Sequence, residues 1–481
     1  MSVDATSPAQ PKGVPLHNIL SFGSLGMPLA ALLLVYGLYL PRFYAGLGLS
    51  FVAVSAAVAS VRFIDMAFDP IIALVMDRTK TPIGRYRPWL ILGAPFAMLG
   101  AWKLLIPEAH PTAGYLILWL IVTYVGTSMM TLGIAAWSAI LATGYHDRSR
   151  VYGITQGMGV VGSVAFLLLP VFTGGKVVAG KAASMPAICM ILLVALPLGV
   201  LITALFSPER IMAPANRPQF KMSDYWAAIS RPTLLRVILA DFVLTLGPGT
   251  TAPLYVYFFH DAKGFSIADV GFLLIFYIGA GILGAPFWAR VARRFGKHTT
   301  IQIACVFYAI CQTVLMALPR VHEPYMRIPD ALPTCVGMFA VGFCASAFLL
   351  LIRAMVADIV DEVKLETKQD LTSLLFSMVT TTTKIGGTIT VLIVFPILQF
   401  VGYNGKEGAV NTEHAIFGLE MCYLFAPIIL VFFGGAMLFG YKLDAKRHSE
   451  IQAALEQEAE SAHLAASEES LIGPTAGAPA Q

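Results

Sequence analysis

Charged residues are scarce in this sequence: Asp, Glu, Lys and Arg make up 12% of its 481 residues, whereas hydrophobic residues make up 57%. Soluble domains carry about 25% charged residues, so this chain has too little polar surface to cover a water-soluble globule. The six cysteines show no paired spacing of the kind that holds a metal. We therefore expect neither disulfides nor metal ligands, and no apolar signal-peptide core precedes residue 18.

Long apolar runs fill most of the chain instead. A run of about 20 apolar residues is long enough to cross a bilayer, and backbone in lipid must satisfy its own hydrogen bonds, so such runs are helices. The sequence predicts an all-α integral membrane protein with twelve transmembrane helices. The predicted spans are 18–40, 48–76, 88–106, 113–143, 151–174, 184–206, 233–259, 267–289, 298–319, 333–357, 370–401 and 415–440.

The spans divide into two six-helix halves. A polar, Pro-containing stretch at 207–232 separates residues 18–206 from residues 233–440 and is predicted to be a cytoplasmic linker. A glycine followed by a cation occurs at equivalent places, Gly84-Arg85 and Gly296-Lys297. Weak internal symmetry of this kind is expected of major facilitator transporters.

The distribution of Lys and Arg predicts the orientation. Most of the 32 Lys and Arg residues fall on the side of the even-numbered connections and the two tails, so residues 1–17 and 441–481 are expected to be cytoplasmic. The C-terminal tail, residues 441–481, is predicted to form a short surface helix followed by disorder. The net charge of +4 is explained by loops that face anionic lipid, so no nucleic-acid partner is expected.

Two acids lie inside the second predicted span. Asp65 and Asp69 are four residues apart and share a helix face, with Arg62 nearby. A charge at membrane depth costs about 2.5 to 3.5 kcal/mol on insertion scales and usually marks function. A purely structural pair between Arg62 and Asp65 is the alternative, but it leaves the second acid unneutralised, which favours a cation or proton site.

A lysine lies just as deep in the eleventh span. Lys384 is too far from the start of that span to reach water, so it needs an anionic partner. Asp65 or Asp69 is one candidate and a ligand anion is the other. At the cytoplasmic ends of spans 2 and 10 lie further charges, which we predict to act in gating: Asp77, Arg78, Arg85, Arg87, Asp358 and Asp361.

Four motifs occur in order along the chain: IDxxxDP from residue 64, DRTKxxxGRYRPW from residue 77, ADxVDxxxLxT from residue 357 and KIGG from residue 384. Together they resemble the glycoside-pentoside-hexuronide:cation symporter family. The resemblance implies a twelve-helix major facilitator fold and alternating access. The family's functional residues fall on Asp65 and Asp69 for the cation, Arg62 and Lys384 beside it, and Trp137 in span 4.

The sequence departs from the family at the sugar. The family's span-1 acid, span-4 acid and span-5 arginine fall on Pro28, Gly133 and Gln156, so the polar clamp for a galactoside is missing. Phe68 replaces an amide between the two acids, which favours a proton over sodium, although Thr127, Ser128 and Thr131 offer oxygens that keep sodium open. The predicted substrate-binding residues are Trp137, Gln156, Thr131, Tyr255 and Lys384.

Three classes of function follow. A cation-coupled symporter of a sugar, glycoside or related small polar solute is favoured, and a transporter of an amphiphile such as a lysolipid is the alternative. A membrane-embedded enzyme would need a nucleophile or metal cluster, and no grouping of His, Cys or Glu qualifies. We expect no cofactor, a small-molecule substrate, a monomer in the lipid bilayer, and a place in the plasma membrane, which is the inner membrane if the source is bacterial.

Overall fold

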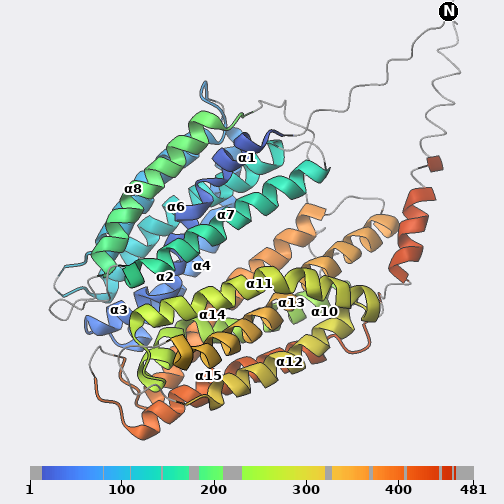
Figure 1. Cartoon of the computed structure of the whole chain (residues 1–481). Coiled ribbons are helices and arrows are strands. Elements are labelled where there is room, and N and C mark those ends of the chain that lie inside the picture. The colour runs from blue at the N-terminus through green and yellow to red at the C-terminus, as the bar shows by residue number, and fades with distance from the viewer. Residues whose placement is uncertain are drawn as a thin grey trace, which may run out of the picture.

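The chain folds into two bundles of long helices that lie side by side (Figure 1). The computed structural model describes residues 14–461 apart from 80, 109, 142–144, 173–183, 210–229, 320–327, 368–371, 406–408, 442, 444–446 and 458–459. Across these residues the secondary structure is helical and contains no strand. The predicted all-α membrane architecture is therefore confirmed.

The first bundle contains the N-terminal spans. Its helices are α1 (Leu16–Gly23), α2 (Gly26–Leu38), α3 (Leu40–Gly46), α4 (Phe51–Arg78), α5 (Arg87–Leu105), α6 (Ala113–Leu141), α7 (Tyr145–Phe172) and α8 (Ser184–Phe206). Helices α1 and α2 together form the first span, Leu16–Leu38.

The second bundle contains the C-terminal spans. Its helices are α10 (Pro232–Tyr257), the short π-helix η1 (Phe258–Ala262), α11 (Ile267–Phe295), α12 (Lys297–Ala317), α13 (Ile328–Thr367), α14 (Thr372–Phe400) and α15 (Glu413–Ala436). Within the described residues, eleven spans are long and apolar enough to cross a membrane. In the remaining helix, α7, the apolar stretch is shorter, Gly153–Leu168, so the count is close to the predicted twelve.

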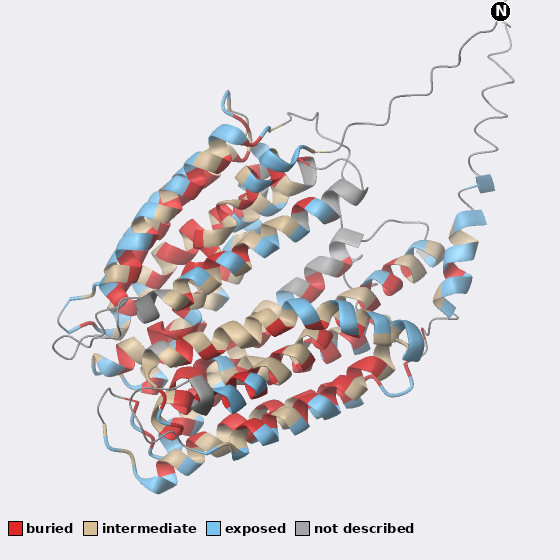
Figure 2. Ribbon diagram, viewed as in Figure 1, coloured by how far each residue is buried: buried red, intermediate tan, exposed pale blue. Residues whose placement is uncertain are grey.

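Burial follows composition along these helices. Large apolar side chains such as Leu283 and Ile429 are about three-fifths exposed, at 60% and 62%, because they lie on the outside of a bundle that is built for lipid. Figure 2 shows buried residues running along the inward faces of the helices in both bundles. Hydroxyl caps begin three helices: Ser50, Ser266 and Thr412 each accept a hydrogen bond from the backbone N–H three residues later.

The two bundles meet along specific helix pairs. Helix α4 packs against α14, α7 against α11, and α2 against α10. These pairs bring the acids of α4 next to the second half of the chain. We call the end of the bundles where α1 begins and α13 ends the inner end, and the opposite end the outer end.

The predicted boundaries of the linker and the tail are only partly visible. Most of the linker 207–232 lies outside the described residues, so its prediction stands untested. A tail helix covers residues 447–457, where a short surface helix is predicted. The stretch predicted to be disordered, after residue 461, also lies outside the described residues.

Candidate functional site

The α4 acids meet a lysine from the other half of the chain. Lys384 of α14 donates a hydrogen bond to Asp69 Oδ2, and its Nζ lies 3.9 Å from Asp65 Oδ2. Both acids are mostly buried, with side chains 7% and 15% exposed. Of the two partners that the sequence allowed for Lys384, the structure shows the acids. One ammonium group thus joins the two bundles at mid-depth.

Each carboxylate keeps an oxygen outside these bonds. Ser128 donates a 2.6 Å hydrogen bond to Asp65 Oδ1 from α6. Asp69 Oδ1 is buried and has no hydrogen-bond partner among the described residues. Buried polar atoms are normally paired, so an unpartnered carboxylate oxygen beside a single lysine is a place where a proton or a cation can bind.

Two neighbours of the acids lie differently from the sequence-based interpretation. The Arg62 guanidinium lies 4.8 Å from the centre of the Tyr124 ring, in a cation–π contact, whereas Asp65 forms an ion pair with Lys384. Phe68 is 46% exposed. The predicted effect of its ring on the two carboxylates stays a prediction.

Trp137 is a packing residue in this conformation. It is fully buried, its ring contacts Phe22 edge-on at 5.5 Å, and its Nε1 donates to the Pro208 carbonyl at 3.3 Å. The Arg87 guanidinium lies 5.7 Å from the ring centre. The predicted stacking of Trp137 on a sugar would require these contacts to open, and that role stays a prediction.

The other predicted substrate residues are scattered. Thr131 is exposed on α6, and its hydroxyl donates to the Thr127 carbonyl at 2.9 Å. Gln156 is exposed on α7. Tyr255 is buried on α10, where its hydroxyl donates to the Val270 carbonyl at 2.9 Å and its ring lines a cavity. Their roles in substrate binding remain predictions.

At Pro28 and Gly133, where the family has the acids that hold the sugar, neighbouring helices pack closely. A Cβ atom at Gly133 would lie 2.6 Å from Leu90 Cδ1, so a larger residue there requires the Leu90 side chain to shift. Pro28 is buried, and its ring lies 3.3 Å from a Cβ atom added at Gly199. The departure from the family pattern is therefore a change in helix packing as well as in charge.

At the inner end, the loop before α5 is held by a residue that the sequence did not single out. Glu209 Oε1 accepts hydrogen bonds from the backbone N–H groups of Arg85 (2.5 Å) and Tyr86 (2.8 Å), and Glu209 Oε2 lies 3.9 Å from Arg87 Nε. Gly84 has φ +120°, and a Cβ there would lie 2.0 Å from Glu209 Oε2. The only signal in the sequence was the glycine between the cations of the loop.

The structure says less about the other residues of the first half that were predicted to act in gating. Arg78 is exposed at the end of α4. The side chain of Asp77 lies outside the described residues. The contacts seen for Arg85 and Arg87 include Ser207 and Glu209 at the start of the linker, and Met76, Ile83 and Trp137 of the first half.

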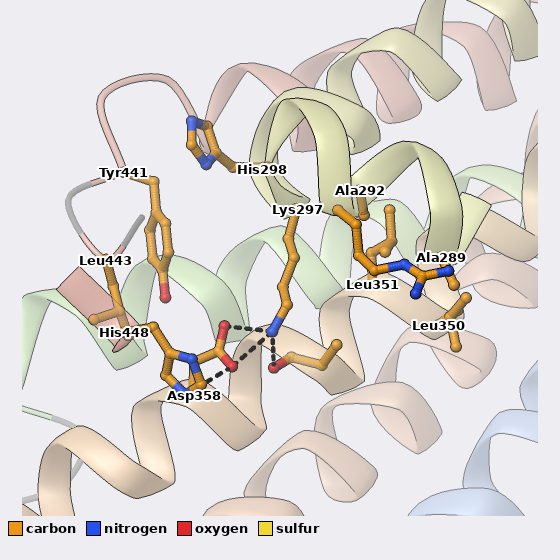
Figure 3. Close-up of a pocket in the computed structure, with 13 residues that line it drawn as sticks. Ala289, Ala292, Lys297, His298, Leu350, Leu351, Asp358, Tyr441, Leu443 and His448 are labelled. Atoms are coloured by element: carbon orange, nitrogen blue, oxygen red, sulfur yellow. Dashed lines mark hydrogen bonds and ion pairs between the residues drawn. The ribbon is translucent and has the colours of Figure 1, made fainter. Parts of the chain in front are cut away.

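The inner end of the second half carries a matching cluster (Figure 3). Lys297 donates to both carboxylate oxygens of Asp358 at 2.6 Å, and His448 of the tail helix lies 3.3 Å from Asp358 and 3.2 Å from Asp361. Burial raises the pKa of the nearby Tyr441 hydroxyl above its usual range, and the negative charge of Asp358 adds to this effect. The predicted gating acids are thus engaged within their own half.

At the outer end, a polar bridge joins the halves. We define the outer bridge as Arg42, His260, Asp261 and Tyr403. Arg42, which lies on α3, reaches Asp261 at 3.0 Å and His260 at 3.1 Å, and Tyr403 also donates a hydrogen bond to Asp261. Burial and the charge of Asp261 raise the pKa of the Tyr403 hydroxyl, so it remains a proton donor.

The sequence did not predict the outer bridge, because its residues lie in three separate connections between spans. Nothing in the sequence aligns Arg42, after the first span, with residues that follow the seventh and eleventh spans. None of the described ion pairs at the inner end joins residues 18–206 to residues 233–440. The outer end is therefore tied across the halves in this conformation, whereas the described ion pairs of the inner end are not.

Comparison with known proteins agrees with this architecture. The sequence model of a family described as "MFS/sugar transport protein" matches residues 21–445. The chain belongs to that family. It is accordingly a multi-pass membrane transporter of the major facilitator type and not an enzyme, and the family resemblance of its four motifs is confirmed.

Individual relatives are distant. The isoprimeverose transporter of Lactiplantibacillus pentosus is 26% identical over 441 residues, which cover 87% of each chain. The sodium-dependent lysophosphatidylcholine symporter 1 of Homo sapiens is 23% identical over 433 residues, covering 82% of this chain and 76% of that protein. The crystal structure of the nucleoside transporter NupG matches with a TM-score of 0.65 and 13% identity, over 88% of this chain and 100% of the other, which shows the common fold.

Proposed function

We propose that this transporter is a cation-coupled symporter of a sugar or glycoside, in which Asp65, Asp69 and Lys384 couple ion binding to the movement of the two halves. The contact from Lys384 on α14 to the acids on α4 carries the proposal, because it joins the halves through charge at membrane depth. The similarity to the isoprimeverose transporter supports a sugar as the substrate.

The coupling step follows from electrostatics. A proton or cation that binds the unpartnered oxygen of Asp69 neutralises the charge that holds Lys384. The lysine then keeps only its 3.9 Å contact with Asp65, and the conformation in which α4 and α14 separate becomes less costly. An ion shifts such an equilibrium only through its different affinity for the two states, and the bond to Lys384 supplies that difference.

We favour the proton as the coupling ion. A proton needs a single free carboxylate oxygen, which Asp69 Oδ1 provides. A metal cation needs several oxygen ligands. The Thr127, Ser128 and Thr131 hydroxyls donate their protons to other oxygens but keep their lone pairs, so they are the oxygens that a sodium site would use. The sodium dependence in the name of the lysolipid relative makes sodium the alternative to test.

The outer bridge assigns a state to this structure within the proposed cycle. We propose that the structure represents a state closed at the outer end, because Asp261 is tied across the halves there. With both tails in the cytoplasm, as the sequence predicts, this is an inward-facing state. The predicted inner gate would form in the opposite state, when Arg85 and Arg87 approach Asp358 and Asp361. Alternating access then exchanges the outer bridge for inner contacts.

Uptake into proteoliposomes tests the proposal. A panel of radiolabelled sugars that includes isoprimeverose is offered under a pH gradient without sodium and under a sodium gradient at uniform pH. We expect accumulation with the pH gradient and its loss in Asp65→Asn and Asp69→Asn, whereas Asp269→Asn, at the surface end of α11, should transport normally. Accumulation that is undiminished in both α4 variants would remove the coupling site from the proposal, and uptake driven by sodium alone would overturn the choice of ion.

The second candidate function is transport of an amphiphile. Its support is the packed-over clamp at Pro28 and Gly133, together with the lysophosphatidylcholine symporter among the relatives. A labelled lysophospholipid belongs in the same panel. Accumulation of this lipid without any sugar uptake would favour the second candidate.

A further inference from the structure

A groove of about 480 Å³ lies on the outside of the second bundle, between α11, α12 and α13. It is lined by aromatic, aliphatic and cysteine side chains, with no charged residue among them. Three of its rings, those of Phe287, Phe295 and Phe307, are 45%, 52% and 53% exposed. The groove is therefore open to the surroundings, which are lipid in a membrane transporter.

The shape of the groove follows from the packing of its helices. A Cβ atom at Gly342 of α13 would lie 2.3 Å from the Tyr277 carbonyl oxygen of α11, so these two helices approach closely, as small residues permit in membranes. On the adjoining face of α13, Ala340 and Cys344 are one turn apart and line the groove. Small side chains on the middle helix, between large rings on its two neighbours, leave the space empty.

The length of the groove matches one leaflet of a bilayer. Its residues run from Phe287 to Phe295 on α11 and from Ile303 to Cys311 on α12. Eight residues rise about 12 Å in a helix, and half of the hydrocarbon core is about 15 Å thick. Since α11 ends at Phe295 and α12 begins at Lys297, the groove starts near the inner end and extends toward mid-depth.

The groove offers its occupant almost no hydrogen bonding. Trp288 is 3% exposed, and its Nε1 donates to the Phe343 carbonyl at 2.8 Å. The strongest donor among the lining side chains is thus already used between α11 and α13. An occupant gains dispersion contacts along the groove, which suits an acyl chain.

A cation lies at the inner end of the groove. The Arg294 guanidinium is 5.5 Å from the centre of the Phe295 ring, and that ring lines the groove. Arg294 is exposed and forms no ion pair with any described residue. Arg290, one turn earlier, donates to the Pro286 carbonyl. Arg294 therefore places a positive charge without a partner acid beside an apolar groove.

We propose that this groove binds an anionic phospholipid, with the phosphate at Arg294 and one acyl chain along α11, α12 and α13. Arginine donates paired hydrogen bonds to phosphate, and a cation near the membrane surface attracts lipids of net negative charge. The groove alone accepts the chain of any lipid, so the arginine supplies the selectivity. The site does not depend on the coupling mechanism proposed above.

Two substitutions test the two parts of the site. Arg294→Gln removes the cation, and its matched control is Arg293→Gln. Arg293 is the adjacent residue and is also exposed without an ion pair among the described residues, but it lines the cavity near Asp358 instead. Ala340→Leu fills the groove. Its control is Gly281→Leu, at a position outside the groove where a Cβ meets nothing within 4 Å.

The readout is photolabelling of the purified protein in phosphatidylcholine nanodiscs. The probes are phosphatidylglycerol and phosphatidylcholine that carry the same diazirine-bearing acyl chain, with labelled residues mapped by mass spectrometry. Labelling of Ile429, which is 62% exposed on α15, serves as the reference for general contact with lipid. Relative to Ile429, we expect phosphatidylglycerol to label Phe307 or Phe339 about fivefold more than phosphatidylcholine does, the factor for one arginine near the surface.

Arg294→Gln should remove this excess, and Arg293→Gln should keep it. Ala340→Leu should lower the labelling of the groove by both lipids, whereas Gly281→Leu should leave it unchanged. Equal labelling by the two lipids, or an excess that responds equally to both arginine substitutions, would overturn the proposal. So would labelling that Ala340→Leu leaves unchanged.

A groove that neither lipid labels would also contradict the proposal, and a cross-linked dimer in that case would assign the groove to a second copy of this chain. Because the readout is labelling, its outcome is separate from any result on sugar uptake.

Discussion

The Arg42 guanidinium, in the first half of the chain, lies 3.0 Å from the Asp261 carboxylate in the second half. The same carboxylate accepts a hydrogen bond from Tyr403, so one acid anchors the connections that follow spans 1 and 11. The arginine also lies 5.1 Å from the centre of the Tyr257 ring. The bridge thus links an ion pair to the aromatic cluster of Phe51, Tyr257, Phe395 and Tyr403.

Loss of this ion pair should shift the transporter toward outer opening. Arg42→Gln removes a charge-assisted bond present only in the bridged state, so we expect roughly a tenfold change in the equilibrium between states. The measurement is labelling of Ala252→Cys by an impermeant maleimide from the outer side, in a chain whose native cysteines are serine. Arg290→Gln, at an exposed position on α11, is the control, and unchanged labelling in Arg42→Gln would show that the bridge does not hold the outer end closed.

Replacement of Lys384 should separate charge from packing. Lys384→Met leaves two buried acids without their cation, and we expect accumulation to fall at least about tenfold while the protein still inserts. Lys384→Arg keeps the charge and should retain part of the activity. Initial uptake rates and surface expression are measured together, and equal rates for the Met and Arg variants would mean that the positive charge has no role.

Gly84 should tolerate no side chain. Its φ of +120° is strained for other residues, and an added Cβ would collide with Glu209, so Gly84→Ala should lower stability by more than about 1 kcal/mol. Thermal aggregation in detergent measures the effect. Gly46→Ala, where a Cβ has open space, is the control. If the double variant Gly84→Ala/Glu209→Ala loses less stability than the two single variants together, the collision is with the Glu209 side chain. A Gly84→Ala protein as stable as the parent would contradict the prediction.

The tail helix should detach when its histidine is removed. His448 lies between Asp358 and Asp361, and Ile451 on the same helix is 2% exposed. His448→Ala should therefore speed tryptic cleavage at Arg447. His414→Ala, at an exposed position at the start of α15, serves as the comparison. Identical cleavage rates in both variants and the parent would show that the tail is held by its apolar contacts alone.

The sequence predicted the elements well because lipid imposes a simple rule. Each predicted span overlaps an observed helix, and the largest differences lie at helix ends that extend into water, as in α13, which continues to Thr367. The pairing of Lys384 with an acid was predictable for a related reason: a lysine at that depth has no access to water and must find an anion.

Contacts that depend on relative helix rotation were not predictable. Arg62 and Asp65 share a face by spacing, yet Arg62 lies on the Tyr124 ring, because α6 offers an aromatic face there. Trp137 follows small residues that suggested free space, but Phe22 of α1 fills it. Such outcomes are set by which neighbouring helix faces the residue, and a single chain's local pattern does not contain that information.

Two contacts join the halves at different depths: the contact of Lys384 with the α4 acids, and the outer bridge. This difference in depth couples the movements of the two ends. Asp69 is nine residues from Arg78, so the lysine contact lies about 14 Å along α4 from its inner end, and the outer bridge lies beyond the opposite end of that helix. If the two halves rotate about the contact of Lys384 with the α4 acids, a small separation of the halves at the outer bridge brings their inner ends together. The ion that weakens the contact of Lys384 with Asp69 would then affect the opening of both the outer and the inner end.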